Sequence, residues 1–404
     1  MKKIMLMAAT VMMSLAANAQ NPDGLKQVMS ASKYSEANNL LKTASETMLS
    51  TEKAKAYNKL VDLAVAECTK AEEAAVKAQL SKDDAEMNKQ NAKKAKAAYN
   101  AVKSAMLCND ADNEPNEKGQ VKPKFQSKNA SRILPIRNTL INCGLEAYNS
   151  KDYASAQKYF GLFAESRQNA LFSKTDFSAE TNYGQICYYA ALAAYFNKDG
   201  KKCSKYADYA LQSGDKEIVN DVITVKLGAL EEQAKAAQID TLKYISSVKK
   251  LAKEYPDNEG VFGKLVALYD ESGDKVGAQK ALNARLKENP NDAMANAYVG
   301  QNAQAENKYD EAIAAYEKAL QTKPDFLAAK LNVGICYLSK AAAAIDANSD
   351  TRGNVKPEAK AGIVADLNKA KTTIEEVKAA DPDKAQVNWA YPLERVNYIL
   401  ENLK

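Results

Sequence analysis

The first quarter of the chain places its apolar side chains at helical spacing and contains few helix breakers. Residues from about 30 to 108 are rich in Ala, Lys, Glu and Leu, and the stretch 51–107 has neither Pro nor Gly. The apolar positions recur every three or four residues along one stripe, which is typical of an amphipathic helix. This pattern predicts two long helices, over 51–80 and 82–107.

The second half of the chain carries prolines at a fixed interval. Pro256, Pro290 and Pro324 are 34 residues apart, and the apolar side chains between them repeat in phase. Between the last two prolines the pattern predicts one helix over 293–306, a short turn, and a second helix over 309–322. A fixed period of this length is typical of an array of stacked helix pairs.

Small residues recur where the two helices of a pair are expected to meet. The first helix carries Gly300, and the second carries Ala312 followed four residues later by Tyr316. These positions resemble the tetratricopeptide (TPR) motif, in which Leu-Gly, Ala-x3-Phe and a closing Pro occupy the same places. Gly and Ala let two backbones approach closely, while larger side chains fill the surrounding space. The chain departs from the motif at Asn296 and Ala303, which stand where TPR repeats carry Trp and Tyr.

Further copies extend this resemblance over residues 131–404, and the strongest copies lie within 259–337. Gly144 and Gly334 occupy the position of Gly300 in two of these copies. The resemblance implies an all-α fold, a right-handed TPR-type α-solenoid of stacked antiparallel helix pairs. The helices over 20–108 exceed the usual TPR length, so we expect a separate helical N-terminal module there. An irregular helical bundle is the alternative.

Two segments interrupt the helical pattern. Residues 109–130 are rich in Asn, Asp, Pro, Gly and Lys, which predicts a linker and a domain boundary. Tyr337 and Ala370 are 33 residues apart where the repeat allows nine, so about 24 residues are inserted, near 341–364. We expect this insertion to be a solvated loop rather than a functional one. A helix that begins at Trp389 is expected to cap the open end of the array.

The N-terminus has the three parts of a secretory signal peptide over residues 1–19. Two lysines precede an apolar run over 4–17, and an Ala-x-Ala sequence ends at Ala19. The apolar run is shorter than the ~20 residues that a spanning helix needs. We therefore expect a TPR protein of the exported bacterial type, whose mature chain begins near Gln20 and is soluble in the periplasm.

The mature chain carries little net charge. Without the two lysines of the signal peptide, 54 basic residues stand against 51 acidic residues, a net charge of about +3. This charge is too small and too evenly spread to indicate a nucleic acid or an anionic membrane as the partner. No later segment is long and apolar enough to cross a bilayer. We therefore expect neither nucleic-acid binding nor membrane insertion.

The chain lacks the residue patterns of catalysis. It contains no His, the commonest general base and metal ligand, and no glycine loop of the kind that cradles phosphates. Its six cysteines form no close Cys-x2-Cys pair, so a metal site is not expected. Six cysteines allow 15 pairings in an oxidising compartment, whereas Cys143 and Cys336 fall on the packed sides of helices. Pairing stays open, and we expect no enzymatic activity, cofactor or metal.

The resemblance also implies where a partner binds, because the first helices of TPR pairs line a concave groove. The candidates on these helices are Asp270, Glu271, Met294, Gln301, Gln304, Leu331, Ile335 and Leu338. Such a surface, mildly polar and shading into apolar residues, suits an amphipathic helix. The last three residues have an alternative role, which is to pack against the insertion or the next helix pair.

Three functions fit these features. The first is a non-enzymatic scaffold or adaptor of the periplasm that binds another envelope protein or peptide in its groove. The second is a periplasmic binding protein for a small ligand, a glycan or a peptide; this function calls for a deep aromatic pocket, whereas most of the 21 tyrosines fall in packing positions. The third is a structural envelope protein that self-associates through an end of the array, which a terminal capping helix disfavours.

Overall fold

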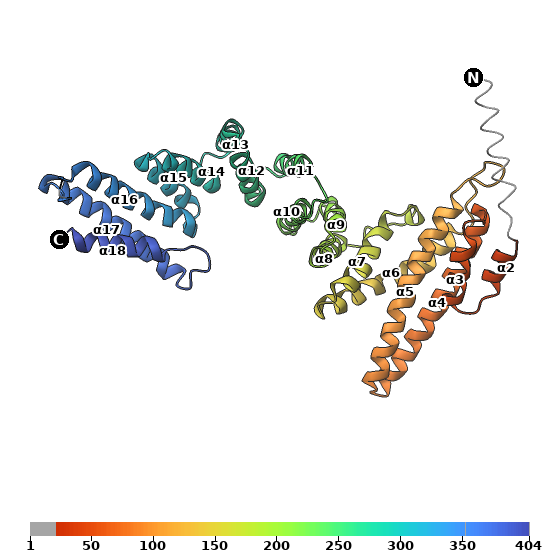
Figure 1. Ribbon diagram of the computed structural model, residues 1–404. Helices are drawn as coiled ribbons and strands as arrows, with labels where there is room; N and C mark the ends of the chain where they lie inside the picture. The colour runs from red at the N-terminus through yellow and green to blue at the C-terminus, as the bar shows by residue number, and fades with distance from the viewer. Residues whose placement is uncertain (1–21, 352, 404) are drawn as a thin grey trace, which may run out of the picture. The chain divides into compact units, whose positions relative to one another are not determined.

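The computed structural model describes residues 22–351 and 353–403, and these residues form an all-α protein (Figure 1). Among them are seventeen α-helices and no strand, only an isolated antiparallel bridge between Ser349 and Val355. None of these helices combines the length and the apolar character that crossing a membrane requires. The signal peptide expected over 1–19 lies outside the described residues.

The chain divides into two compact units, with the boundary between Tyr244 and Ile245. The division falls inside α11 (Thr241–Glu254). Unit 1 contains the following helices: α2 (Pro22–Ser30), α3 (Tyr34–Ala44), α4 (Ser50–Leu80), α5 (Asp84–Asp112), α6 (Gln126–Asn149), α7 (Tyr153–Gln168), the 3-10 turn η1 (Ala170–Phe172), α8 (Tyr183–Phe196), α9 (Gly200–Gln212) and α10 (Val219–Lys235).

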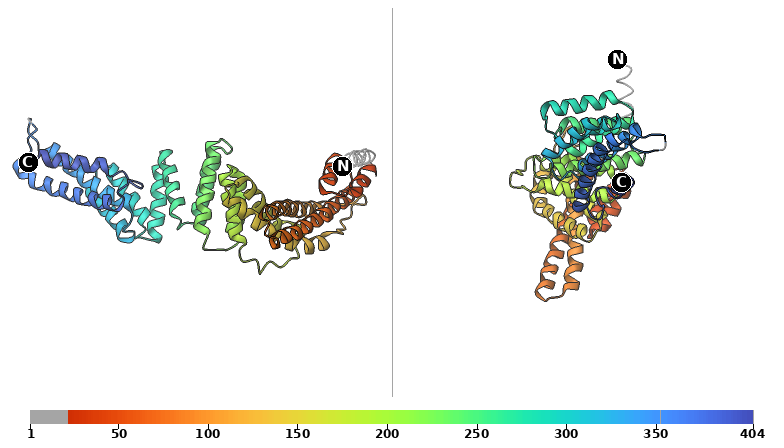
Figure 2. Two further views of the ribbon diagram at one scale, coloured as in Figure 1. Left: turned by 90° about the horizontal axis from the view of Figure 1, so that it is seen from below. Right: turned by 90° about the vertical axis from the view of Figure 1, so that its left-hand side faces the viewer.

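The two long predicted helices are α4 and α5, which run side by side as an antiparallel hairpin (Figures 1 and 2). Alanines such as Ala64 and Ala101 are fully buried between them, and this allows the helices to pack closely. The hairpin reverses at Lys82, whose φ of 56° is left-handed, and Asp83 then caps α5 by accepting a hydrogen bond from the backbone N–H of Glu86.

The core of unit 1 is continuous from α4 to α10, so the long hairpin belongs to the same core as the helix pairs that follow. Residues 113–125 connect α5 to α6 within this unit. Asp112 accepts hydrogen bonds from the backbone N–H groups of Lys124 and Phe125, at 2.5 and 2.7 Å, which holds this loop against the end of α5. Where the sequence predicts a linker over 109–130, the structure therefore has a shorter, tethered loop. The two compact units divide elsewhere.

Unit 2 consists of helix pairs joined by short turns. Its helices after α11 are α12 (Glu259–Glu271), α13 (Lys275–Glu288), α14 (Ala293–Ala305), α15 (Tyr309–Thr322), α16 (Leu327–Asn348), α17 (Pro357–Ala380) and α18 (Ala390–Asn402). α14 and α15 agree with the predicted helices to within one residue. In five helix pairs of the two units, one residue in a left-handed conformation follows the first helix, and these residues are Lys151, Lys198, Ala237, Gly273 and Asn307.

Glycine contacts define how the two helices of a pair pack. A Cβ atom added at Gly300 of α14 would lie 2.9 Å from the ring of Tyr316 on α15. In unit 1, a Cβ at Gly144 of α6 would overlap the ring of Phe160 on α7. Only a residue without a side chain permits such an approach. Antiparallel pairs packed in this way make the fold a TPR-type α-solenoid.

The insertion lengthens two helices instead of forming a loop. α16 has 22 residues and α17 has 24, compared with 13 in α14. A short link over 349–356 connects them. The expectation of a solvated loop was wrong for most of this segment, because the run Ala341–Ala344 continues α16 and alanine is the strongest helix former.

The last helix, α18, covers α17 and the end of α16. Leu393 and Val396 of α18 are buried against these two helices together with Trp389. The indole of Trp389 donates a hydrogen bond to the carbonyl oxygen of Asp381 at 2.7 Å, which ties α18 to the end of α17.

Candidate partner-binding site

The structure places the predicted groove residues in different environments. Asp270, Glu271 and Gln301 are exposed on α12 and α14. Gln304 is half-buried and accepts a hydrogen bond from the hydroxyl of Tyr316 at 2.9 Å. Met294 is half-buried and packs against the core between α12 and α14. Three of these five residues are thus available to a partner, whereas the other two also hold helices together.

The apolar part of the predicted groove is covered in this structure. Leu331 and Leu338 are only 7% and 5% exposed, and Ile335 packs beside them. All three lie against the core that α16 forms with α17 and α18. The lengthened α17 and the terminal helix bury the stripe that a shorter repeat leaves open. Packing, the alternative role considered for these residues, is what the structure shows.

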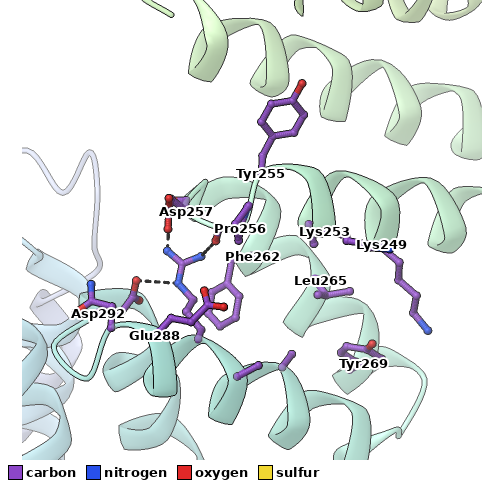
Figure 3. A pocket seen from close by; sticks show the side chains of 15 residues that line it. Lys249, Lys253, Tyr255, Pro256, Asp257, Phe262, Leu265, Tyr269, Glu288 and Asp292 are labelled. Atoms are coloured by element: carbon purple, nitrogen blue, oxygen red, sulfur yellow. Dashed lines mark hydrogen bonds and ion pairs between the residues drawn. The ribbon is translucent and has the colours of Figure 1, made fainter.

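A hollow of about 350 Å³ lies between α11, α12 and α13, within unit 2 (Figure 3). Its walls are mainly apolar, with two aromatic rings, and small residues on α13 leave it open. The apolar lining residues are Ala252, Phe262, Leu265, Tyr269, Ala281 and Ala284.

One residue that departs from the repeat pattern accounts for this hollow. Val266 stands seven residues before the turn residue Gly273, the position that Gly300 holds before Asn307. Because valine has a branched side chain, α12 cannot approach α13 as closely as α14 approaches α15. Val266 and its partner Leu282 are both buried, so the bulk lies between the two helices.

Arg285 forms one end of the hollow and joins three segments. Its Nε donates to Oδ2 of Asp292 at 2.7 Å, and an Nη donates to the carbonyl oxygen of Pro256 at 2.7 Å. The guanidinium carbon lies 4.4 Å from the ring centre of Phe262. Asp292 also caps α14 by accepting a hydrogen bond from the N–H of Ala295. These bonds fix α13 against the turn before α12 and the start of α14.

Charged side chains of opposite sign lie at the two ends of the hollow. Lys249 and Tyr269 lie together at one end, whereas Asp257 and Glu288 lie at the other (Figure 3). The Lys249 ammonium is 4.9 Å from the ring centre of Tyr269, a cation–π distance. The site therefore has an apolar centre, a basic end at Lys249, and an opposite end where Asp257 and Glu288 stand beside the Arg285–Asp292 ion pair and leave a net negative charge.

The described residues offer no evident catalytic chemistry. They contain no cluster of three or more Cys, Asp or Glu side chains placed to hold a metal ion. The six cysteines are unpaired, and burial raises the pKa of the Cys108, Cys187 and Cys203 thiols to about 12. A thiol that keeps its proton at neutral pH is a poor nucleophile and a poor metal ligand. The arrangement suits binding.

Sequence reasoning missed this hollow. None of the lining residues Phe262, Leu265, Tyr269 and Arg285 was among the predicted groove residues. The available signal was Val266, a bulky residue at a position where the neighbouring copy carries glycine.

No family model matches the chain. A peroxisomal targeting signal receptor from Candida glabrata is 31% identical over 99 residues, which are 24% of this chain and 16% of the receptor. The chain therefore spans only a small part of the length of that relative.

Solved TPR structures match most of the chain at low sequence identity. A TPR repeats protein from Bacteroides fragilis is 18% identical and covers 65% of this chain and 98% of its own, with a TM-score of 0.29. Yeast Tom70 is 12% identical and covers 91% of this chain and 92% of its own, with a TM-score of 0.24. The TPR2AB domain of yeast Sti1, solved as a complex with pHSP90, is 15% identical and covers 82% of this chain and 98% of its own, with a TM-score of 0.23. All three scores are low, so the assignment of a TPR-type fold rests on the helix pairs of this chain.

Proposed function

We propose that this protein is a non-enzymatic scaffold or adaptor that binds a segment of another protein. The observation that carries the proposal is the hollow between α11, α12 and α13, an open apolar site held in place by packed helices and by Arg285. Apolar side chains of a partner would contribute the most binding free energy at such a site, because they leave water and the walls that they contact are already formed.

We infer the chemistry of the partner from the charges at the ends of the hollow. An amphipathic helix would place one or two apolar side chains over Phe262 and Leu265. An acidic residue of the partner would then lie near Lys249, and a basic residue near Glu288, because complementary charges favour one orientation. The exposed groove residues Asp270 and Gln301 are the proposed contacts for the rest of the partner.

We further propose that the protein acts in the bacterial periplasm on another envelope protein. The support is the signal-peptide pattern over residues 1–19. Cell fractionation followed by N-terminal sequencing tests the location. A periplasmic product that begins near Gln20 is expected, and an uncleaved cytoplasmic product would refute this part of the proposal.

A second candidate function is the binding of a small ligand, a glycan fragment or a short peptide. The specific observation is the size of the hollow, since about 350 Å³ lies within the range of small-molecule sites. Phe262 and Tyr269 supply aromatic walls for such a ligand.

The two functions are separated by filling the hollow. Ala284 is exposed and lines the site, so Ala284→Trp places an indole in the hollow without burying it in the core. Val276→Trp is the matched control, because Val276 is 79% exposed on the same helix and does not line the site. Each tagged full-length variant is crosslinked in cells and purified, and its attached proteins are identified by mass spectrometry.

A scaffold should retain one recurrent protein in the wild type and in Val276→Trp, and lose it in Ala284→Trp. Retention in both variants would refute the hollow as the binding site. A rise in melting temperature with a saccharide or short peptide, seen in the wild type and absent from Ala284→Trp, would favour the second function, because a ligand of the native state stabilises it.

A further inference from the structure

The helix α18, the last that the structure describes, covers one side of the array and has an outer face that departs from what an exposed array end requires. The end of a solenoid needs a polar face to stay apart from other molecules. Here Tyr391 and Tyr398 are each 66% exposed, and both lie on the outer face of α18. They are seven residues apart, or two helical turns, so their rings form one ridge about 10 Å long.

The two sides of this ridge carry charges of opposite sign. Glu394 and Arg395 lie between the tyrosines in sequence, and both are exposed. Successive residues of a helix are 100° apart, so Glu394 is on one side of the ridge and Arg395 is on the other. Neither forms an ion pair with a residue that the structure describes.

We propose that this face binds the same face of a second copy of the chain, with the two α18 helices parallel about a two-fold axis. In a two-fold interface both copies use the same surface, so this surface must be complementary to itself. In a parallel pair, the side of the ridge that carries Glu394 in one copy faces the side that carries Arg395 in the other copy. Glu394 of each copy therefore meets Arg395 of the other, twice, while Tyr391 and Tyr398 each pack against their own counterpart.

The size of the face sets the strength of this dimer. A helix of 13 residues is about 20 Å long, so the contact is smaller than that of a permanent dimer. The dimer is therefore weak and reversible, with a dissociation constant on the order of 10–100 μM. It joins two arrays end to end and leaves the hollow beside Arg285 uncovered, so it goes beyond the proposed function and does not depend on it.

Sedimentation velocity of the purified full chain, from about 5 to 200 μM, tests this proposal without any partner protein. The wild type should shift from monomer to dimer over this range. Tyr391→Ser with Tyr398→Ser should remain monomeric. Leu80→Ser is the matched control, because Leu80 is 81% exposed at the tip of the α4–α5 hairpin and lies outside the face. It should dimerise as the wild type does.

Charge exchange identifies the contact itself. Glu394→Arg alone and Arg395→Glu alone place like charges opposite each other, so each variant should be monomeric. An equal mixture of the two, or the double exchange in one chain, restores opposite charges and should restore the dimer. A wild type that stays monomeric at all concentrations would overturn the proposal, and so would a dimer that both single variants leave unchanged. Circular dichroism of each variant confirms that its helices are intact.

Discussion

Gly334 of α16 and Ile374 of α17 are in direct contact, although forty residues separate them. A Cβ atom added at Gly334 would lie 2.6 Å from Cγ1 of Ile374. Gly300 and Tyr316 make the equivalent contact across sixteen residues, and so do Gly144 and Phe160. The insertion between Gly334 and Ile374 thus lengthens both helices of a pair while it preserves their point of closest approach.

Replacing the glycine at this point of approach is expected to destabilise the protein. Gly300→Ala puts a methyl group 2.9 Å from the Tyr316 ring, so the buried ring and α15 must move. We expect a loss of about 1–3 kcal/mol in the free energy of unfolding, the usual cost of overpacking a core. Urea denaturation followed by circular dichroism measures it.

Gly362 provides the control, because it lies within α17 and a Cβ atom there meets nothing within 4 Å. Gly362→Ala should stabilise by about 0.5–1 kcal/mol, since alanine restricts the unfolded chain. If the two variants shifted stability in the same direction, the close approach of helix pairs would not be the feature that glycine serves.

The ion pair between Arg137 and Glu180 is expected to stabilise the fold of unit 1. Arg137 is fully buried; it donates to both carboxylate oxygens of Glu180 and to the hydroxyl of Ser166. Its guanidinium carbon also lies 3.8 Å from the ring centre of Phe163. Glu180→Gln leaves the buried cation without its counter-charge and should cost about 2–4 kcal/mol.

The matched control for this ion pair is Glu232→Gln. Glu232 pairs with Lys235 at 3.2 Å, and both side chains are more than half exposed. Exposed pairs of this kind contribute at most about 0.5 kcal/mol. Thermal unfolding of the two variants in parallel compares them, and equal melting temperatures would contradict a stabilising role for the buried pair.

Asp381 is expected to make the attachment of α18 sensitive to acid. Hydrogen bonds from the backbone N–H groups of Val387, Gln386 and Ala385 lower the pKa of its carboxyl group. The unfolded chain has the ordinary pKa of about 3.9. The ionised carboxylate therefore stabilises the fold fully above that pKa, and this contribution is lost as the pH falls through the lower folded value.

Asp381→Asn should accordingly melt below the wild type at neutral pH. The difference between the two melting temperatures should narrow as the pH falls below about 3.9. Melting curves of both proteins between neutral and acidic pH measure this difference. A gap that stays constant down to the most acidic samples would show that the carboxylate charge has no part in holding the 382–388 segment.

The sequence predicted some parts of the fold closely, for identifiable reasons. α14 and α15 were predicted to within one residue, because Pro290 and Pro324 mark the ends of the pair and Asp292 provides the cap of α14. The two long helices α4 and α5 were predicted because their alanine-rich sequence has no helix breaker over 51–107. These signals are local, and local signals can be read without knowing the neighbours of a segment.

Other parts depend on contacts between distant segments. The sequence around Leu331 and Leu338 fits a position in an open groove as well as a position against α18. Only the path of α17 and α18 decides between these two environments. The hollow depends on how far Val266 separates two helices, and Arg285 closes it through contacts 28 and 29 residues back in the chain. Helix separations and contacts between distant segments are not encoded in any local pattern of residues.

The thiols are expected to be unreactive in the folded protein. Burial raises the pKa of Cys143 and Cys336 to about 11, and it also raises the pKa of Cys68. Ellman's reagent should therefore label the native protein slowly at neutral pH and label six thiols after denaturation. Cys143 is half-buried and the other five cysteines are buried, so rapid labelling of several thiols in the native state would contradict this structure.

The most direct test of partner binding places a photocrosslinking amino acid in the hollow. Position 284 lies inside the site and position 276 lies outside it on the same helix, so the pair separates the hollow from the rest of α13. The full-length protein is irradiated in cells, and crosslinked products are resolved by size. We predict one discrete product from position 284 and none from position 276. Equal products from both positions, or a product from position 276 alone, would contradict binding in the hollow.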